Sequence, residues 1–146
     1  MPSDPGVRQT VLVVDDNDKL TALFARLLTD AGYVVEIAHD GLSALMMAAK
    51  ILPDVVLLDV MLPEVNGFEV CRRLKEAYAT RLTPVILVTS LADREDRLAG
   101  LAAGADDFLN KPVDNEELMI RVRSAARVKQ FTDDLDSAAS IVMTMA

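Results

Sequence analysis

Carboxylates end two of the most apolar segments of this chain. The segment TVLVV runs into Asp15 and Asp16, and the segment VVLL runs into Asp59. A carboxylate at the edge of an apolar core is costly unless a partner compensates its charge. Three converging carboxylates either hold protons or share a cation, and ligands that are all oxygen suit a hard ion. These residues therefore predict a site for Mg²⁺, with Mn²⁺ as its substitute.

Asp59 in such a site has the chemistry of a nucleophile toward phosphorus, and attack would form an aspartyl phosphate. The metal ion and the ammonium group of Lys111 would neutralise charge on the transferred phosphoryl group. The hydroxyl of Thr89, at the end of the segment TPVILVT, would donate to a phosphoryl oxygen.

Strand-like and helix-like segments alternate along the chain and must position these side chains. Strands that are apolar on both faces imply a parallel sheet covered by helices on each side. Ligands of such sheets bind beyond the carboxyl ends of the strands, so the candidate residues should gather at one rim. Strands are expected at 10–14, 33–38, 54–59, 83–90 and within 104–112, and helices at 18–31, 41–51, 67–78, 93–103 and from 114 or 115 onward.

Length, charge and cysteine content exclude several classes of protein. A chain of 146 residues suits one domain. It has no apolar run near the roughly 18 residues of a membrane span and no secretory signal. The single cysteine, Cys71, excludes an intramolecular disulfide and indicates a reducing cytosol. A net charge of −8 argues against direct binding to nucleic acid or to an anionic membrane. We therefore expect a cytoplasmic protein.

Four motifs carry a family likeness. VLVVDDN, LLDVMLPEVNG, ILVTS and NKP stand in the order and approximate spacing of the receiver domains of two-component response regulators. The chain resembles this family over about residues 10–130. The resemblance implies a flavodoxin-like (βα)5 fold, a three-layer sandwich with strand order 2-1-3-4-5. It also implies signalling by phosphoryl transfer from the phosphohistidine of a sensor histidine kinase or a phosphotransfer protein, with self-phosphorylation and self-dephosphorylation but no enzymatic action on other substrates.

The resemblance assigns a role to each matching position. Phosphorylation would draw Thr89 inward, and Phe108 would turn into the vacated space. This movement would remodel the face formed by the fourth helix, the fifth strand and the fifth helix. The implied roles are phosphoacceptor for Asp59, metal ligands for Asp15, Asp16, Asp59 and the backbone carbonyl of Met61, switch pair for Thr89 and Phe108, phosphate contact for Lys111, and a cis bond between Lys111 and Pro112.

Two apolar residues lie near the predicted site. Met61 and Leu91 each stand two positions after a key residue, where some receivers carry polar side chains. Neither side chain can orient an attacking water molecule. We therefore predict slow self-hydrolysis of the aspartyl phosphate.

The residues after Arg127 follow a different pattern. Apolar residues recur there in steps of three and four, which is a heptad seam. We expect a flexible segment at 1–8, a receiver domain at 9–127 and a helical extension at 128–146 that leads to a missing output domain. A weak homodimer is expected through this helix or through the face of the fourth helix, fifth strand and fifth helix. The seam consists of Val128, Phe131, Leu135, Ala138, Val142 and Met145.

The sequence leaves alternatives open for the output domain and for the class of protein. The segment DLDSAASIVMTMA resembles the link between receivers and HD-GYP phosphodiesterases of cyclic di-GMP. A second reading is a stand-alone receiver that acts by protein binding. A third is a flavodoxin-like domain that binds a nucleotide or flavin, although DDNDKL offers negative charge where that class carries a phosphate-binding loop.

Overall fold

The structure of the protein is a computed structural model that describes residues 8–90 and 94–145, with side chains at 8–90 and 95–139. The segment predicted to be flexible, 1–8, thus lies outside the described residues except for Arg8. Strands and helices alternate as predicted. The elements are β1 (Thr10–Val14), α1 (Asp18–Asp30), β2 (Val34–Ala38), α2 (Gly41–Ile51), β3 (Val55–Asp59), α3 (Gly67–Glu76), β4 (Val85–Thr89), α4 (Arg94–Ala102), β5 (Asp107–Asn110) and α5 (Asn115–Met145).

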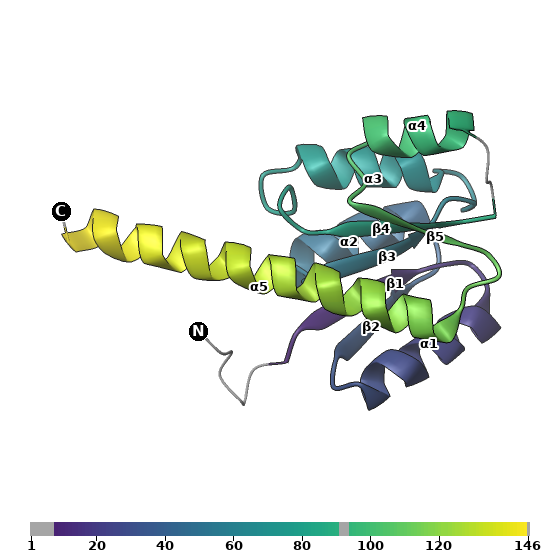
Figure 1. Ribbon diagram of the computed structural model, residues 1–146. Helices are drawn as coiled ribbons and strands as arrows, with labels where there is room; N and C mark the ends of the chain where they lie inside the picture. The colour runs from purple at the N-terminus through teal and green to yellow at the C-terminus, as the bar shows by residue number, and fades with distance from the viewer. Residues whose placement is uncertain (1–7, 91–93, 146) are drawn as a thin grey trace.

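All five strands run parallel in one sheet, in the order β2-β1-β3-β4-β5. Helices α1 and α5 cover one face, and α2, α3 and α4 cover the other (Figure 1). This confirms the parallel sheet covered on both faces that the segments predicted, and the flavodoxin-like strand order that the family resemblance implied. The register places Val14 beside Leu58 and Thr89 beside Asn110, so the carboxyl ends of the inner strands reach one rim.

The three inner strands form the centre of the core. Every residue of β3 and of β4 is buried, which explains why their sequences are apolar without alternation. Each fully buried valine or leucine contributes about 1.5–3 kcal/mol. The strands are therefore a rigid support for whatever residues follow them.

Cys71 is buried in the layer between the sheet and α3, and this burial raises the pKa of its thiol to about 11.

Helix α2 buries small residues and leaves several larger apolar residues exposed. Leu42, Met46 and Ala49, which recur along one side of the helix, are exposed, whereas the buried residues of this helix are Gly41, Ala44 and Ala48. Small residues let α2 approach its neighbours closely. A Cβ atom at Gly41 would lie 2.8 Å from a methyl group of Val70 on α3.

Helix α5 is much longer than the sheet is deep. It runs without interruption for 31 residues, through the predicted boundary at 127 and 128, and projects beyond the other elements (Figure 1). Lys129 pairs with Asp54 at the start of β3 at 3.8 Å, and the side chain of Gln9 donates to the carbonyl of Ala126.

The described part of the heptad seam faces solvent. Val128, Phe131 and Leu135 are each more than half exposed, and Ala138 is exposed as well. The side chains of Val142 and Met145 lie outside the described set. Within the described ranges, no helix has both the length and the apolar character that crossing a bilayer requires.

Candidate functional site

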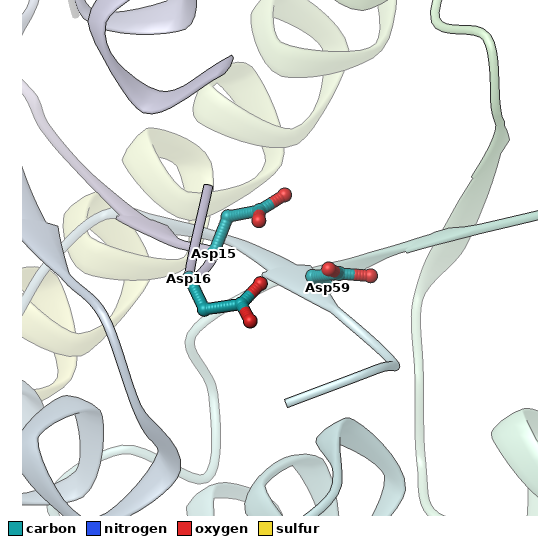
Figure 2. Close-up of side chains that lie close together, drawn as sticks. All are labelled: Asp15, Asp16 and Asp59. Carbon is teal, nitrogen blue, oxygen red and sulfur yellow. The ribbon is translucent and has the colours of Figure 1, made fainter. Parts of the chain in front are cut away.

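Three aspartates converge at the rim where β1 and β3 end. One carboxylate oxygen from each of Asp15, Asp16 and Asp59 lies within 4.8 Å of the others. The side chains extend from the ends of the two strands into the same space (Figure 2). Asp15 and Asp59 are each only 3% exposed, whereas Asp16 is open to solvent. The predicted cluster of carboxylates is therefore present, with two buried members and one exposed member.

Local hydrogen bonds fix the turn that carries Asp15 and Asp16. The amide of Asp15 donates to the carbonyl of Ala38 at the end of β2, and the amide of Asn17 donates to Asp15 Oδ1 at 2.9 Å. Asn17 then caps α1, because its side chain accepts from the amides of Lys19 and Leu20. The acidic turn is thus held by the sheet on one side and by a helix start on the other.

Lys111 supplies the positive charge of the site. Its Nζ atom lies 3.1 Å from Asp59 Oδ2 and 3.8 Å from Asp15 Oδ2. Its amide donates to the carbonyl of Thr89, which aligns the residue after β5 with the end of β4. The peptide bond between Lys111 and Pro112 is cis, as the family resemblance implied.

The site holds more negative than positive charge in a partly buried place, and this changes the pKa of Asp15. The pKa of Asp15 is raised above its usual value, mainly because burial disfavours the charged form. The negative charges of Asp59 and Asp16 also raise this pKa, while the hydrogen bond from Asn17 and the charge of Lys111 lower it. One ammonium group therefore does not fully compensate three carboxylates.

These donors fit a hard divalent cation. The cluster offers carboxylate oxygens only, and it retains uncompensated negative charge that a cation would neutralise. The amide of Met61 donates to Asp59 Oδ1 at 3.2 Å, which fixes the backbone that follows Asp59. Use of the Met61 carbonyl as a further ligand remains a prediction.

The predicted switch pair lies on β4, which is next to the strand that ends in Asp59, and on β5 beyond it. Thr89 is buried at the end of β4, and Phe108 is partly buried on β5, where it pairs with Leu87. Their movement on phosphorylation remains a prediction. Leu91, which we named with Met61 as a determinant of slow hydrolysis, lies outside the described residues.

Two residues absent from the predicted site contribute to its geometry. Gly67 begins α3 directly against the end of β3, where a Cβ atom would collide with the carbonyl oxygen of Asp59 and lie 2.6 Å from the Cα atom of Val60. The Nδ1 atom of His39 lies 3.2 Å from the carbonyl of Asp15. The dipeptide Asn66-Gly67 signals a turn, but its spacing from Asp59 in the sequence does not disclose the steric contact.

The arrangement can bind a cation and carry out a substitution at phosphorus. Asp59 is a buried carboxylate with one oxygen held by an amide and the other by Lys111. An electrophilic phosphorus at the open side of the rim would meet a nucleophile, an ammonium group and cation ligands at once.

Known proteins resemble this chain closely. A family model described as "Response regulator receiver domain" matches residues 11–123. The response regulator PleD of Caulobacter vibrioides is 50% identical over 125 residues, which are 86% of this chain and 28% of PleD. The chain thus spans little more than a quarter of that relative's length.

Solved structures agree with the sequence comparison. A putative response regulator from Chloroflexus aurantiacus superposes with a TM-score of 0.79 at 36% identity, covering 83% of this chain and 99% of that one. A receiver domain called DrrB, described as BeF3 activated, gives a TM-score of 0.73 at 35% identity, with 83% and 99% coverage.

Proposed function

This chain belongs to the family of response regulator receiver domains, which act in two-component signalling, and we propose on this basis that Asp59 is its phosphoacceptor. The observation that carries the proposal is the juxtaposition of three carboxylates with Lys111 Nζ, 3.1 Å from Asp59 Oδ2. A buried carboxylate between an amide and an ammonium group is oriented for attack.

In the proposed reaction, an Asp59 oxygen forms a bond to phosphorus as the bond from phosphorus to the donor breaks. The donor is the phosphohistidine of a sensor kinase or phosphotransfer protein, and its imidazole leaves with the bonding electrons and takes up a proton. Lys111 stabilises the negative charge on the transferred group. Asp15, Asp16, Asp59 and the Met61 carbonyl would hold Mg²⁺. When bound, this ion supplies further positive charge for the phosphoryl oxygens.

The consequence that we propose is a shift between two conformations. Thr89 would donate to a phosphoryl oxygen, and Phe108 would change position with it, which alters the face of α4, β5 and α5. The domain modifies only itself in this scheme, so we do not assign it an enzymatic activity on other substrates. We place it in the cytoplasm, where sensor kinases present their phosphohistidine.

In this proposal, helix α5 transmits the conformational change out of the domain. Helix α5 belongs to the proposed responsive face and continues beyond the body as one helix, so it would pass the change to an output domain after residue 146. The resemblance of its last residues to HD-GYP linkers suggests a cyclic di-GMP phosphodiesterase as that output. The exposed seam would favour a weak dimer.

The phosphoacceptor is tested by intact-mass measurement after incubation with Mg²⁺ and acetyl phosphate. The natural protein should gain the mass of one phosphoryl group, and Asp59→Asn should gain none. Equal labelling of the two proteins would overturn the assignment of Asp59.

A further inference from the structure

The ring of Phe108 lies directly against Gly100 on α4. A Cβ atom at position 100 would lie 2.5 Å from Phe108 Cε1, 2.8 Å from Phe108 Cζ and 3.1 Å from a methyl carbon of Leu87. Real Cβ atoms essentially never make contacts below 3.0 Å, so a side chain at this position would require a shift, and the far end of the Phe108 ring is the group that can shift at low cost. The ring can occupy its observed position because residue 100 has no side chain.

The niche at Gly100 is adjacent to the proposed phosphorylation switch. Phe108 pairs with Leu87, and Asn110 pairs with Thr89 two residues further along β4. Because side chains alternate along a strand, Leu87 and Thr89 point to the same face of the sheet. Phe108, the partner of Leu87, therefore places its ring on the same face of the sheet as Thr89, toward α4.

We propose that Gly100 is a positioning residue for the switch, because its missing side chain forms the niche that holds the Phe108 ring against α4. This inference rests on the proposed function, in which Phe108 changes position when Asp59 is phosphorylated. Glycine is a poor residue for a helix compared with alanine, and the contact with Phe108 is a physical reason for its presence in α4. A methyl group at position 100 would fill the niche and displace the ring from it.

The test is a double-mutant cycle with beryllofluoride as the probe, a mimic of the phosphoryl group. Wild type, Gly100→Ala, Phe108→Ala and the double variant are titrated with beryllofluoride in the presence of Mg²⁺, and bound fluorine is followed by NMR. We expect Gly100→Ala to change the apparent Kd by about threefold or more when Phe108 is present, and by much less in the Phe108→Ala background. Equal changes in both backgrounds, or no change in either, would show that Gly100 does not act through Phe108.

A second measurement leaves Gly100 intact and so does not depend on the folding of Gly100→Ala. The ring should shift the NMR resonances of the Gly100 α-protons, and Phe108→Ala should abolish this shift. Saturation with beryllofluoride should also change it in the wild type, because the ring then leaves the niche. A Gly100 shift that stays constant on saturation would refute the inference.

The cycle separates the two proposals. If beryllofluoride fails to bind the wild type, or binds Asp59→Asn equally well, the proposed function is wrong. If binding requires Asp59 but shows no coupling between residues 100 and 108, only the role of Gly100 is wrong.

Discussion

Lys111 Nζ lies 3.1 Å from Asp59 Oδ2, although the two residues are 52 positions apart in the chain. One follows β5 and the other ends β3, and β4 lies between them in the sheet. The ammonium group thus reaches across a strand to the carboxylate. A divalent cation and Lys111 would share the charge of Asp59, so each should weaken the other's binding there.

Replacement of Lys111 should separate metal binding from phosphorylation. In Lys111→Met, the lost ammonium group no longer competes for Asp59, so Mg²⁺ should bind several-fold more tightly in calorimetric titration. Phosphorylation by acetyl phosphate should nevertheless slow by about 10²-fold, because a charge that stabilises the transferred group is missing. Lys50→Met, on the exposed part of α2, is the matched control and should change neither quantity. A normal phosphorylation rate in Lys111→Met would contradict the role of this residue.

Neutralisation of Asp15 should stabilise the fold in the absence of divalent cations. The pKa of Asp15 is raised from 3.8 in the folded protein, so folding takes up a proton between the unfolded and folded pKa values. The contribution of this group to stability therefore falls as the pH rises through that window. Asp15→Asn keeps an oxygen for the amide of Asn17 and should raise the free energy of unfolding at pH 7 by roughly 1 kcal/mol.

The free energy of unfolding of both proteins is measured by denaturant unfolding in the presence of EDTA. The increase caused by Asp15→Asn should shrink toward zero at pH 3. The same variant should lose the stabilisation that Mg²⁺ confers on the natural protein. A variant less stable than the natural protein at pH 7 would show that Asp15 is better compensated than its surroundings indicate.

Much of this site follows from rules about strand ends. Asp15, Asp16 and Asp59 were predictable because parallel strands bring their carboxyl ends to one rim. Lys111 follows β5, so the same rule placed it at this rim, and the family resemblance added its role as the phosphate contact and its cis bond to Pro112. Gly67 and Gly100 escaped prediction because their importance lies in steric contacts with residues distant in sequence.

The buried face of α2 shows that the hydrophobicity of its residues does not by itself predict which face of a helix is buried. Leu42 and Met46 are the more apolar residues by size, yet Gly41 and Ala48 are buried. Close packing against α3 requires small residues there, and the sequence pattern alone does not reveal how near the neighbouring helix lies.

Met61 should set the lifetime of the phosphorylated state. Its side chain is 63% exposed next to Asp59, and a thioether cannot orient water as an amide or carboxylate can. Met61→Asn should speed the decay of the aspartyl phosphate by a small factor, below the roughly 10²-fold of a positioned general base. Decay is followed by intact mass after removal of acetyl phosphate. A half-life of seconds in the natural protein would contradict the predicted slow hydrolysis.

Gly67 should tolerate no side chain. In Gly67→Ala the new Cβ atom meets the backbone of Asp59 and Val60, which cannot move aside as a flexible side chain can. We expect a loss of about 2–3 kcal/mol in the free energy of unfolding together with slower phosphorylation of the folded fraction. Gly32→Ala is the control, because its φ of +100° introduces strain without a neighbour within 4 Å. It should cost about 1 kcal/mol and leave the phosphorylation rate unchanged.

Phe131 should control self-association through α5. Its side chain is 66% exposed in line with Val128 and Leu135, and burial of this stripe against a second copy would remove apolar surface from water. Phe131→Asp should abolish the concentration-dependent increase in sedimentation coefficient that we expect for residues 1–146. Ser137→Asp places the same charge on an exposed position outside the seam and should preserve association. If the natural protein and a variant lacking residues 130–146 both sediment as monomers at all concentrations, the seam does not mediate dimerisation.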